Sequence, residues 1–239
     1  MTNHSNKIPA PARLPSEPLA GTPLALTLRE QLTQRSALLV IDMQNDFTSD
    51  KGLIAQRGRD PALARGIIDK INGLVDAARR AGKLIVWVET AHSFLEALPN
   101  YLSVHLRGLP KEQWTADQLL VSEGGKGADW HADIRPRLPD EPLITKHMYS
   151  AFRGTRLSQI LDAHRIRTLV LAGCNTNVCI HSTATDAFFD GYYPVLCEDA
   201  CATSDAALHD AFISTHRNFY GLTAASQEIE ADWRGVHPA

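Results

Sequence analysis

The sequence contains few cysteines, and their context argues against two classes of protein. Only four occur among its 239 residues, namely Cys174, Cys179, Cys197 and Cys201. In a chain of this length without a recognisable export signal, free thiols are expected rather than a disulfide framework. The pair Cys197 and Cys201 has neither the spacing nor the neighbouring ligands of a zinc site.

Long apolar runs and clusters of basic residues are also missing. No apolar segment approaches the ~20 residues that a membrane-spanning helix requires. Lysine and arginine total 24 against 27 aspartates and glutamates, a formal net charge of -3, and no basic block is present. Neither a membrane nor a nucleic acid is therefore expected as a partner. Residues 1–22 lack the apolar core of a secretory signal, so a cytoplasmic location is expected.

The sequence does contain enough apolar material for one large domain. Hydrophobic residues make up 44% of the chain, which is typical of a globular protein with a sizeable core. The length suits a single α/β domain better than two small ones. We predict a flexible N-terminal arm over residues 1–23 and one domain over residues 24–239.

Short apolar runs alternate with segments of helical periodicity. The runs predicted as strands are 36–43, 83–89, 142–146, 168–173, 193–198 and 222–225. The segments predicted as helices are 60–81, 155–164, 177–190 and 204–218, and residues 24–33 form a short helix or an extended lead-in. Strands that alternate with helices form parallel βαβ units with right-handed crossovers. The predicted fold is a single doubly wound six-stranded parallel α/β sheet with helices on both faces.

The segment from residue 90 to residue 140 breaks this alternation. It contains several prolines and the run Gly124-Gly125-Lys126-Gly127. A loop this long inside a domain usually shapes a binding site. We predict a long excursion with short helices that folds over the edge of the sheet. The glycine-rich run lacks the spacing of a phosphate-binding loop and the strand that precedes one, which favours a flexible lid or a turn.

The chain is organised around residues 169–179, which contain an apolar strand, a tight turn and the start of a helix. Thr176 and Asn177 are residue types that cap helix N-termini. Cys179 would then lie in the first helical turn, where unpaired N–H groups and the helix dipole favour an anion. Because such a position lowers the pKa of a thiol, we predict a nucleophile at Cys179.

Two further polar residues end predicted strands. Asp42 ends the first strand and Lys146 ends the third, and carboxyl ends of parallel strands meet at one edge of a sheet. There, Asp42 could take and return the thiol proton of Cys179, and Lys146 would favour the thiolate. The backbone N–H groups of Asn175 and Cys179 could stabilise the oxyanion of a tetrahedral intermediate.

Each of these residues also has a structural interpretation. An acid at a strand end often caps a helix, a lysine after a short strand often faces solvent, and a buried cysteine often serves only packing. Asn177 could orient a substrate or cap the helix. Tyr149 and Phe152 could form a wall of a substrate pocket or cover the sheet edge. Residue type and spacing alone leave these alternatives open.

Three motifs, taken together, resemble one family. They are ALLVIDMQNDF at residues 37–47, KHMYSAF at 146–152 and GCNTNVC at 173–179. In this order they resemble the isochorismatase-like cysteine hydrolase superfamily over residues 36–229. The resemblance implies a six-stranded parallel sheet with helices on both faces, and it matches Asp42, Lys146 and Cys179 to the catalytic triad of the family. It also implies a cis peptide bond between Cys174 and Asn175.

The resemblance narrows the chemistry as well. Nicotinamidases of this superfamily carry an Asp and two His metal ligands after the second strand, whereas the corresponding stretch here offers only Glu89 and His92. We therefore expect no metal and no cofactor. Isochorismatases that cleave a vinyl ether lack the nucleophilic cysteine, so Cys179 favours cleavage of a C–N bond through an acyl-cysteine.

The subgroup that the sequence most resembles contains ureidoacrylate, biuret and N-carbamoyl amide hydrolases. This implies a small amide or ureide as substrate and ammonia or a small amine as product. Two alternatives stay open: a metal-dependent nicotinamidase-type amidase, and a non-catalytic member of the fold that binds a small molecule. Several members of the superfamily are dimers or tetramers, so the resemblance also implies a homo-oligomer.

Overall fold

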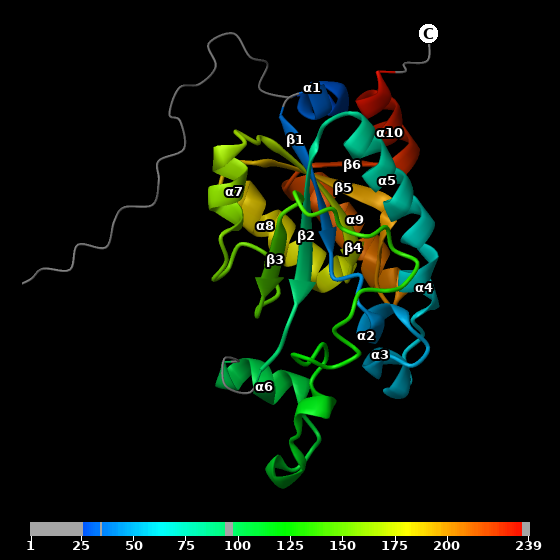
Figure 1. Ribbon diagram of the computed structural model, residues 1–239, viewed down its shortest axis with the longest axis vertical. Coiled ribbons are helices and arrows are strands. Elements are labelled where there is room, and N and C mark those ends of the chain that lie inside the picture. The colour runs from blue at the N-terminus through cyan, green and yellow to red at the C-terminus, as the bar shows by residue number, and fades with distance from the viewer. Residues whose placement is uncertain (1–25, 34, 94–97, 236–239) are drawn as a thin grey trace, which may run out of the picture.

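A parallel sheet lies between two layers of helices (Figure 1). The computed structural model describes residues 26–33, 35–93 and 98–235, so the predicted arm over residues 1–23 lies outside the described residues. The strands are β1 (Ser36–Ile41), β2 (Leu84–Thr90), β3 (Leu143–Lys146), β4 (Thr168–Cys174), β5 (Tyr193–Ala202) and β6 (Leu222–Ala224). All pair in parallel in the order β3-β2-β1-β4-β5-β6, which confirms the predicted doubly wound six-stranded sheet.

Helices cover both faces of the sheet. One face packs against α1 (Leu28–Thr33), α4 (Ala62–Gly66), α5 (Ile68–Arg80) and α10 (Ser226–Arg234). The other packs against α7 (Leu157–Ala163), α8 (His181–Phe189) and α9 (Ala206–Phe219). Because the chain winds outward from β1 in two directions, the switch point of the sheet lies between β1 and β4. In open α/β sheets the carboxyl edge at this point is where ligands bind.

The side chains of β1 explain why this strand is central. Leu38 and Val40 belong to the core under α5, whereas Leu39 and Ile41 belong to the core under α7 and α8. Successive side chains of a strand point to opposite faces, so a sheet covered on both faces buries all of them. Every residue of β1 is indeed buried.

Several elements differ from the predictions. The predicted helix over 60–81 is divided into α4 and α5, and α10 was not predicted at all. α10 is a short polar helix that packs against the core through two apolar residues, Ile229 and Trp233. Because these two positions produce only a weak hydrophobic periodicity, the sequence did not reveal this helix. β5 continues to Ala202, beyond the predicted end at residue 198, and its pairing with β4 shifts in register after Leu171.

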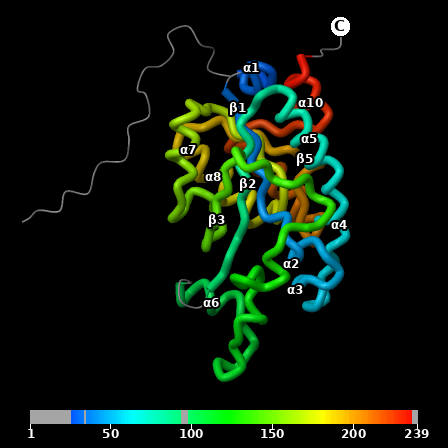
Figure 2. The backbone as a smooth tube through the Cα atoms, viewed as in Figure 1, coloured from blue at the N-terminus to red at the C-terminus, as the bar shows by residue number. Residues whose placement is uncertain are grey.

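The excursion between β2 and β3 consists of short helices, as predicted. It contains α6 (Pro99–His105) and the 3-10 turns η1 (Lys111–Gln113) and η2 (Ala116–Gln118), and α2 (Asn45–Thr48) and α3 (Leu53–Gln56) lie close to it. Figure 2 shows this part of the chain leaving the sheet beyond the carboxyl end of β2.

The carboxylate of Asp46 ties this segment to the body. Its Oδ1 accepts a hydrogen bond from Leu53 N at 2.9 Å, and its Oδ2 accepts one from Val121 N at 2.6 Å.

Within the described ranges, no helix combines the length and the apolar character needed to cross a membrane.

Candidate active site

The turn after β4 carries Cys179. A cis peptide bond joins Cys174 to Asn175, as the resemblance implied. A single π-helical turn, η3 (Thr176–Ile180), follows and runs directly into α8. The prediction that Thr176 and Asn177 cap this helix is wrong, because Asn175 occupies the N-cap position and makes no side-chain cap. Thr176 is instead fully buried, with its Oγ1 2.9 Å from Nδ1 of His209 on α9.

Gly173 allows β4 to approach β1 closely just before this turn. Its φ of 130° lies in the region that favours glycine. A Cβ at this position would collide with the backbone oxygen of Ile41. The residue that follows the end of β1 is Asp42, which has a φ of 55°. Its backbone oxygen accepts a hydrogen bond from Cys174 Sγ at 3.2 Å, so the two strand ends are fixed against each other.

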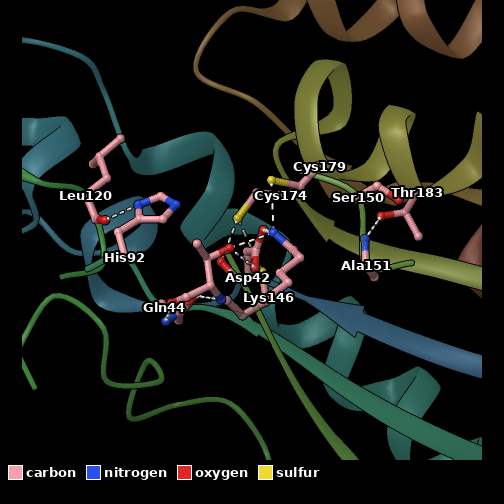
Figure 3. A network of polar contacts seen from close by, with 12 residues as sticks. Asp42, Gln44, His92, Leu120, Lys146, Ser150, Ala151, Cys174, Cys179 and Thr183 are labelled. Atoms are coloured by element: carbon pink, nitrogen blue, oxygen red, sulfur yellow. Dashed lines mark hydrogen bonds and ion pairs between the residues drawn. The ribbon is translucent and has the colours of Figure 1, made fainter. Parts of the chain in front are cut away.

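The structure brings Asp42, Lys146 and Cys179 together at this edge (Figure 3). Lys146 Nζ lies 2.8 Å from Asp42 Oδ2 and 3.4 Å from Cys179 Sγ. Asp42 and Lys146 are 0% exposed and Cys179 is 7% exposed. An acid, an ammonium group and a thiol from three different strand ends therefore share one buried site.

Thr90, at the end of β2, is a fourth member that was not predicted. Its hydroxyl donates to Asp42 Oδ1 at 2.9 Å and accepts from Lys146 Nζ at 2.6 Å. An ammonium group has three donors, and the three contacts of Lys146 are Asp42, Thr90 and Cys179. The position of Thr90 at a strand end was the one sequence signal for a role in the site, because threonine hydroxyls are also common in purely structural roles.

Gln44 holds the end of β2 in place, also without having been predicted. Its Nε2 donates to Thr90 O and to Ala128 O, both at 2.8 Å. Its Oε1 accepts from Thr90 N at 2.9 Å. One amide side chain thus joins the end of β1, the end of β2 and the returning excursion.

The electrostatics of the thiol differ from the prediction. Burial, together with the neighbouring Asp42 carboxylate, raises the pKa of Cys179 to about 12, and Lys146 only partly opposes this rise. The expected lowering is therefore wrong, because loss of water and an adjacent negative charge outweigh the helix start. Burial also disfavours the charged form of Lys146, but Asp42 and Cys179 more than compensate, so the pKa of Lys146 is raised. At rest the sulfur is a thiol beside an ion pair.

Two cavities flank the turn that carries the thiol. We call the larger one, about 720 Å³, the arginine cavity; its lining includes Arg57, Arg59, Arg107, His105, Tyr149 and Val178. The second, about 430 Å³, is the asparagine cavity; its lining includes Asn175, Asn177, Asp60, Asp205, Arg59 and Val178.

Of the predicted substrate-binding residues, Tyr149 lines the first cavity and Asn177 the second. Phe152 lines neither and packs 5.8 Å from the ring of Tyr192.

An aromatic cluster covers the site from the side of the excursion. His92 Nδ1 donates to Leu120 O at 2.7 Å, and its Nε2 therefore accepts from the Tyr101 hydroxyl at 2.8 Å. Burial lowers the pKa of His92 to about 4, so the ring is neutral near pH 7. The Tyr101 ring lies 4.3 Å from His105 and 5.1 Å from Tyr149.

The two side chains considered as metal ligands both have structural partners. His92 is engaged as described, and Glu89 accepts hydrogen bonds from Trp130 Nε1 and Thr145 Oγ1, both at 2.9 Å. In the part of the chain that the structure describes, no three His, Cys, Asp or Glu side chains are grouped so that they could hold a metal ion.

Comparisons with known proteins point to one family. The family model described as Isochorismatase domain matches residues 36–228. The chain is 33% identical over 213 residues to the ureidoacrylate amidohydrolase RutB of Klebsiella pneumoniae subsp. pneumoniae, covering 86% of this chain and 89% of that protein. It is 35% identical over 231 residues to RutB of Variovorax paradoxus, covering 92% and 87%.

Solved structures share the fold as well. A cysteine hydrolase from Pseudomonas syringae pv. phaseolicola superimposes with a TM-score of 0.76 at 20% identity, covering 91% of this chain and 100% of that one. At this identity the likeness concerns the fold alone.

Proposed function

The chain belongs to the isochorismatase family of hydrolases, and from this membership and the geometry of its site we propose that it is a cysteine-dependent amidohydrolase. Its substrate is a small amide or ureide, of the ureidoacrylate, biuret or N-carbamoyl type. The products are ammonia or a small amine and the corresponding acid. Asp42, Lys146 and Cys179 carry the reaction, and no cofactor takes part.

The first half of the reaction forms an acyl-cysteine. Cys179 Sγ attacks the carbonyl carbon while its proton passes to Asp42, so the thiolate exists only as the bond forms. The backbone N–H groups of Asn175 and Cys179 stabilise the oxyanion of the tetrahedral intermediate. The C–N bond then breaks, and the proton on Asp42 moves to the leaving nitrogen.

The second half returns the enzyme to its starting state. Water attacks the acyl-cysteine and gives a proton to Asp42. The C–S bond breaks, the acid leaves, and the sulfur regains the proton from Asp42. Lys146 stays protonated throughout, and its charge stabilises the developing thiolate without taking part in proton transfer. Tyr149 and Asn177 contact the substrate from the two cavities; Phe152, which lines neither, acts only through packing.

The observation that supports this proposal most strongly is the position of one ammonium group. Lys146 Nζ contacts both the Asp42 carboxylate and the Cys179 thiol in a site with almost no exposure. Burying a charge is costly unless it is paired. A protein that only bound a small molecule would have no use for this arrangement beside a thiol.

A screen for ammonia release tests the proposal. The substrates are ureidoacrylate, biuret, N-carbamoyl amino acids and nicotinamide, with Cys179→Ser as the blank and Cys197→Ala as the matched cysteine control. We expect turnover of at least one ureide, a loss of about 1,000-fold or more in Cys179→Ser, and activity that survives chelation.

Three results would contradict this proposal. Activity that persists in Cys179→Ser would remove the nucleophile. Turnover of nicotinamide that a chelator abolishes would favour the metal-dependent alternative. No turnover, together with equal slow labelling of all four cysteines by iodoacetamide, would favour a non-catalytic binding protein.

A homo-oligomeric state and a cytoplasmic location are also part of the proposal. Both rest on the superfamily resemblance and on the composition of the chain. Light scattering of the purified protein tests the first, and a monomer at micromolar concentration would contradict it. Fractionation of the source cell tests the second.

A further inference from the structure

The arginine cavity has a strongly positive lining. Arg57, Arg59 and Arg107 line its wall, and its lining residues within the described ranges include no Asp or Glu, although Asp46 lies near enough to interact electrostatically with Arg57. His105 adds no charge near pH 7, because burial and the nearby Arg57 and Arg107 lower its pKa to about 4. A cavity whose lining carries several positive side chains and no acidic one attracts anions.

This cavity borders the turn that carries the thiol. Val178, which immediately precedes Cys179, forms part of its wall, as does Tyr149. The Tyr149 hydroxyl lies 3.3 Å from His105 Nε2. Burial and the charge of a Cys179 thiolate raise the pKa of Tyr149, while Arg107 opposes the rise. Tyr149 therefore lies within electrostatic range of both the Cys179 sulfur and the Arg107 guanidinium group.

The three arginine side chains differ in whether they already form hydrogen bonds within the protein. Arg57 donates to Gln118 O, and Arg107 Nε donates to Val104 O at 3.1 Å. The Arg59 side chain has no hydrogen bond or ion pair with any other residue that the structure describes, although its backbone N–H bonds to Ile54 O. Arg59 also lines the asparagine cavity, whose lining includes Asn175 and Asn177 as well as the acids Asp60 and Asp205, neither of which forms an ion pair with Arg59 in the described structure. Its guanidinium group is thus free to bind a ligand next to the nucleophile turn.

We propose that the substrate is an acid: a ureido or N-carbamoyl compound whose carboxylate, at the end away from the scissile C–N bond, binds Arg59 in the arginine cavity. Arg57 and Arg107 strengthen the positive field, and Arg59 forms the direct contact. A guanidinium fork matches a carboxylate in geometry and can bind it through two parallel hydrogen bonds. This inference rests on the proposed amidohydrolase function and selects anionic ureides over neutral ones such as biuret.

Paired substrates test the inference. 3-Ureidopropionate and n-propylurea share the urea group and the carbon chain, and they differ in the terminal carboxylate. We expect the wild-type kcat/KM to favour the acid by about 100-fold, which is the size of effect that a charge-assisted pair supports. In Arg59→Gln the KM for the acid rises about 10- to 100-fold with a much smaller change in kcat. Arg59→Lys should recover part of this loss because it keeps the charge.

The matched control is Arg80→Gln, an exposed arginine at the end of α5, which should leave the preference unchanged. Wild-type protein that turns over both compounds equally, or an Arg59→Gln variant that keeps the full preference for the acid, would overturn the inference while the amidohydrolase proposal stands.

A binding measurement separates the two proposals. In the Cys179→Ser protein, calorimetry should show 3-ureidopropionate binding that weakens with salt and is lost when Arg59→Gln is added, with n-propylurea binding much more weakly. If no ureide is turned over but this pattern is found, the amidohydrolase proposal fails and the anion site stands. Equal affinity for the two compounds, or no binding of either, would overturn the anion site.

Discussion

At the scale of single residues, the site depends on a lysine that is completely buried. Lys146 directs its three ammonium donors to Asp42, Thr90 and Cys179. A buried charge with all of its donors satisfied is held in one position, whereas an unsatisfied one is strongly destabilising. The ammonium group therefore fixes the distance between the acid and the thiol, and it supplies positive charge when the thiol loses its proton.

The Thr90 hydroxyl should contribute to activity without touching the substrate. Thr90→Val removes the hydrogen bonds to Asp42 and Lys146 while it keeps the shape of the side chain. We expect kcat to fall about 10- to 100-fold, the usual effect of losing a hydrogen bond to a charged group, together with a shifted pH profile of kcat/KM.

Two variants control for a purely structural effect at Thr90. Thr90→Ser should restore most of the activity, and Thr145→Val, which removes a hydroxyl from the neighbouring strand β3, should change it little. A Thr90→Val enzyme with wild-type kcat and pH profile would show that the hydroxyl plays no part in positioning.

The convergence of Asp42, Lys146 and Cys179 was predictable because each follows an apolar run, and the carboxyl ends of parallel strands meet. The direction of the pKa shift at Cys179 was not predictable. It depends on how much water the excursion and the surrounding strands exclude, and no short motif encodes this. Thr90 and Gln44 were missed because their residue types are common and their roles appear only with their partners.

At the scale of elements, the nucleophile turn depends on the close approach of β4 to β1. Gly173→Ala would place a methyl group against the backbone of Ile41 and force a side chain into a φ of 130°. We expect a loss of about 2 kcal/mol or more in the free energy of unfolding, together with a loss of activity as the turn shifts. Urea denaturation and ammonia release measure the two effects.

Gly66→Ala in α4 is the matched control for Gly173→Ala. A Cβ there meets nothing within 4 Å, and the φ of Gly66 is not in the left-handed region. Alanine favours helix, so this substitution should be neutral or slightly stabilising. A Gly173→Ala protein as stable and as active as Gly66→Ala would contradict the close approach described here.

The elements themselves were largely predictable, but their ends were not. The helix predicted over 204–218 is present as α9 and is capped by Asp205, whose Oδ1 accepts from Ala207 N at 2.9 Å and from Leu208 N at 3.2 Å. The cap expected at Thr176 is absent because that side chain pairs with His209, a contact between distant parts of the chain. Local residue preferences fail where a long-range partner competes for the same side chain.

At the scale of the whole molecule, stability should depend on pH through buried neutral histidines. His216 is 0% exposed, and its Nε2 lies 3.2 Å from Pro194 O. Burial lowers the pKa of His216 to about 4 from 6.5, and His92 and His105 also have pKa values of about 4. Between pH 6.5 and 4 the unfolded chain binds more protons than the folded one, so stability falls as the pH falls.

His216→Gln should flatten this dependence. The shift at His216 corresponds to stability on the order of 3 kcal/mol, present above pH 6.5 and lost as the pH approaches 4. Urea denaturation across this range should show a smaller slope with pH for His216→Gln than for the wild type. His164→Gln, at an exposed histidine, should keep the wild-type slope, and equal slopes in all three proteins would contradict the assignment.

The sheet and its doubly wound character followed from the alternation of strands and helices, whereas the shape of the binding region did not. The arginine cavity brings residues 57 and 59, from the loop after α3, together with residue 107 from the excursion. These segments are separated in the sequence by one strand, β2, and by the helices α4, α5 and α6. Only the path of the excursion places them side by side, and that path depends on contacts such as those of the Asp46 carboxylate.

The most direct test of the central claim is to look for the covalent intermediate. Enzyme turning over a ureide or amide from the ammonia-release screen is quenched in acid within the first turnovers, and its peptides are mapped by mass spectrometry. We predict an acyl group from the substrate on Cys179, formed before the acid product is released and absent from Asp42→Asn. Turnover with Cys179 unmodified at every quench time, or an acyl group on a different residue, would contradict the mechanism.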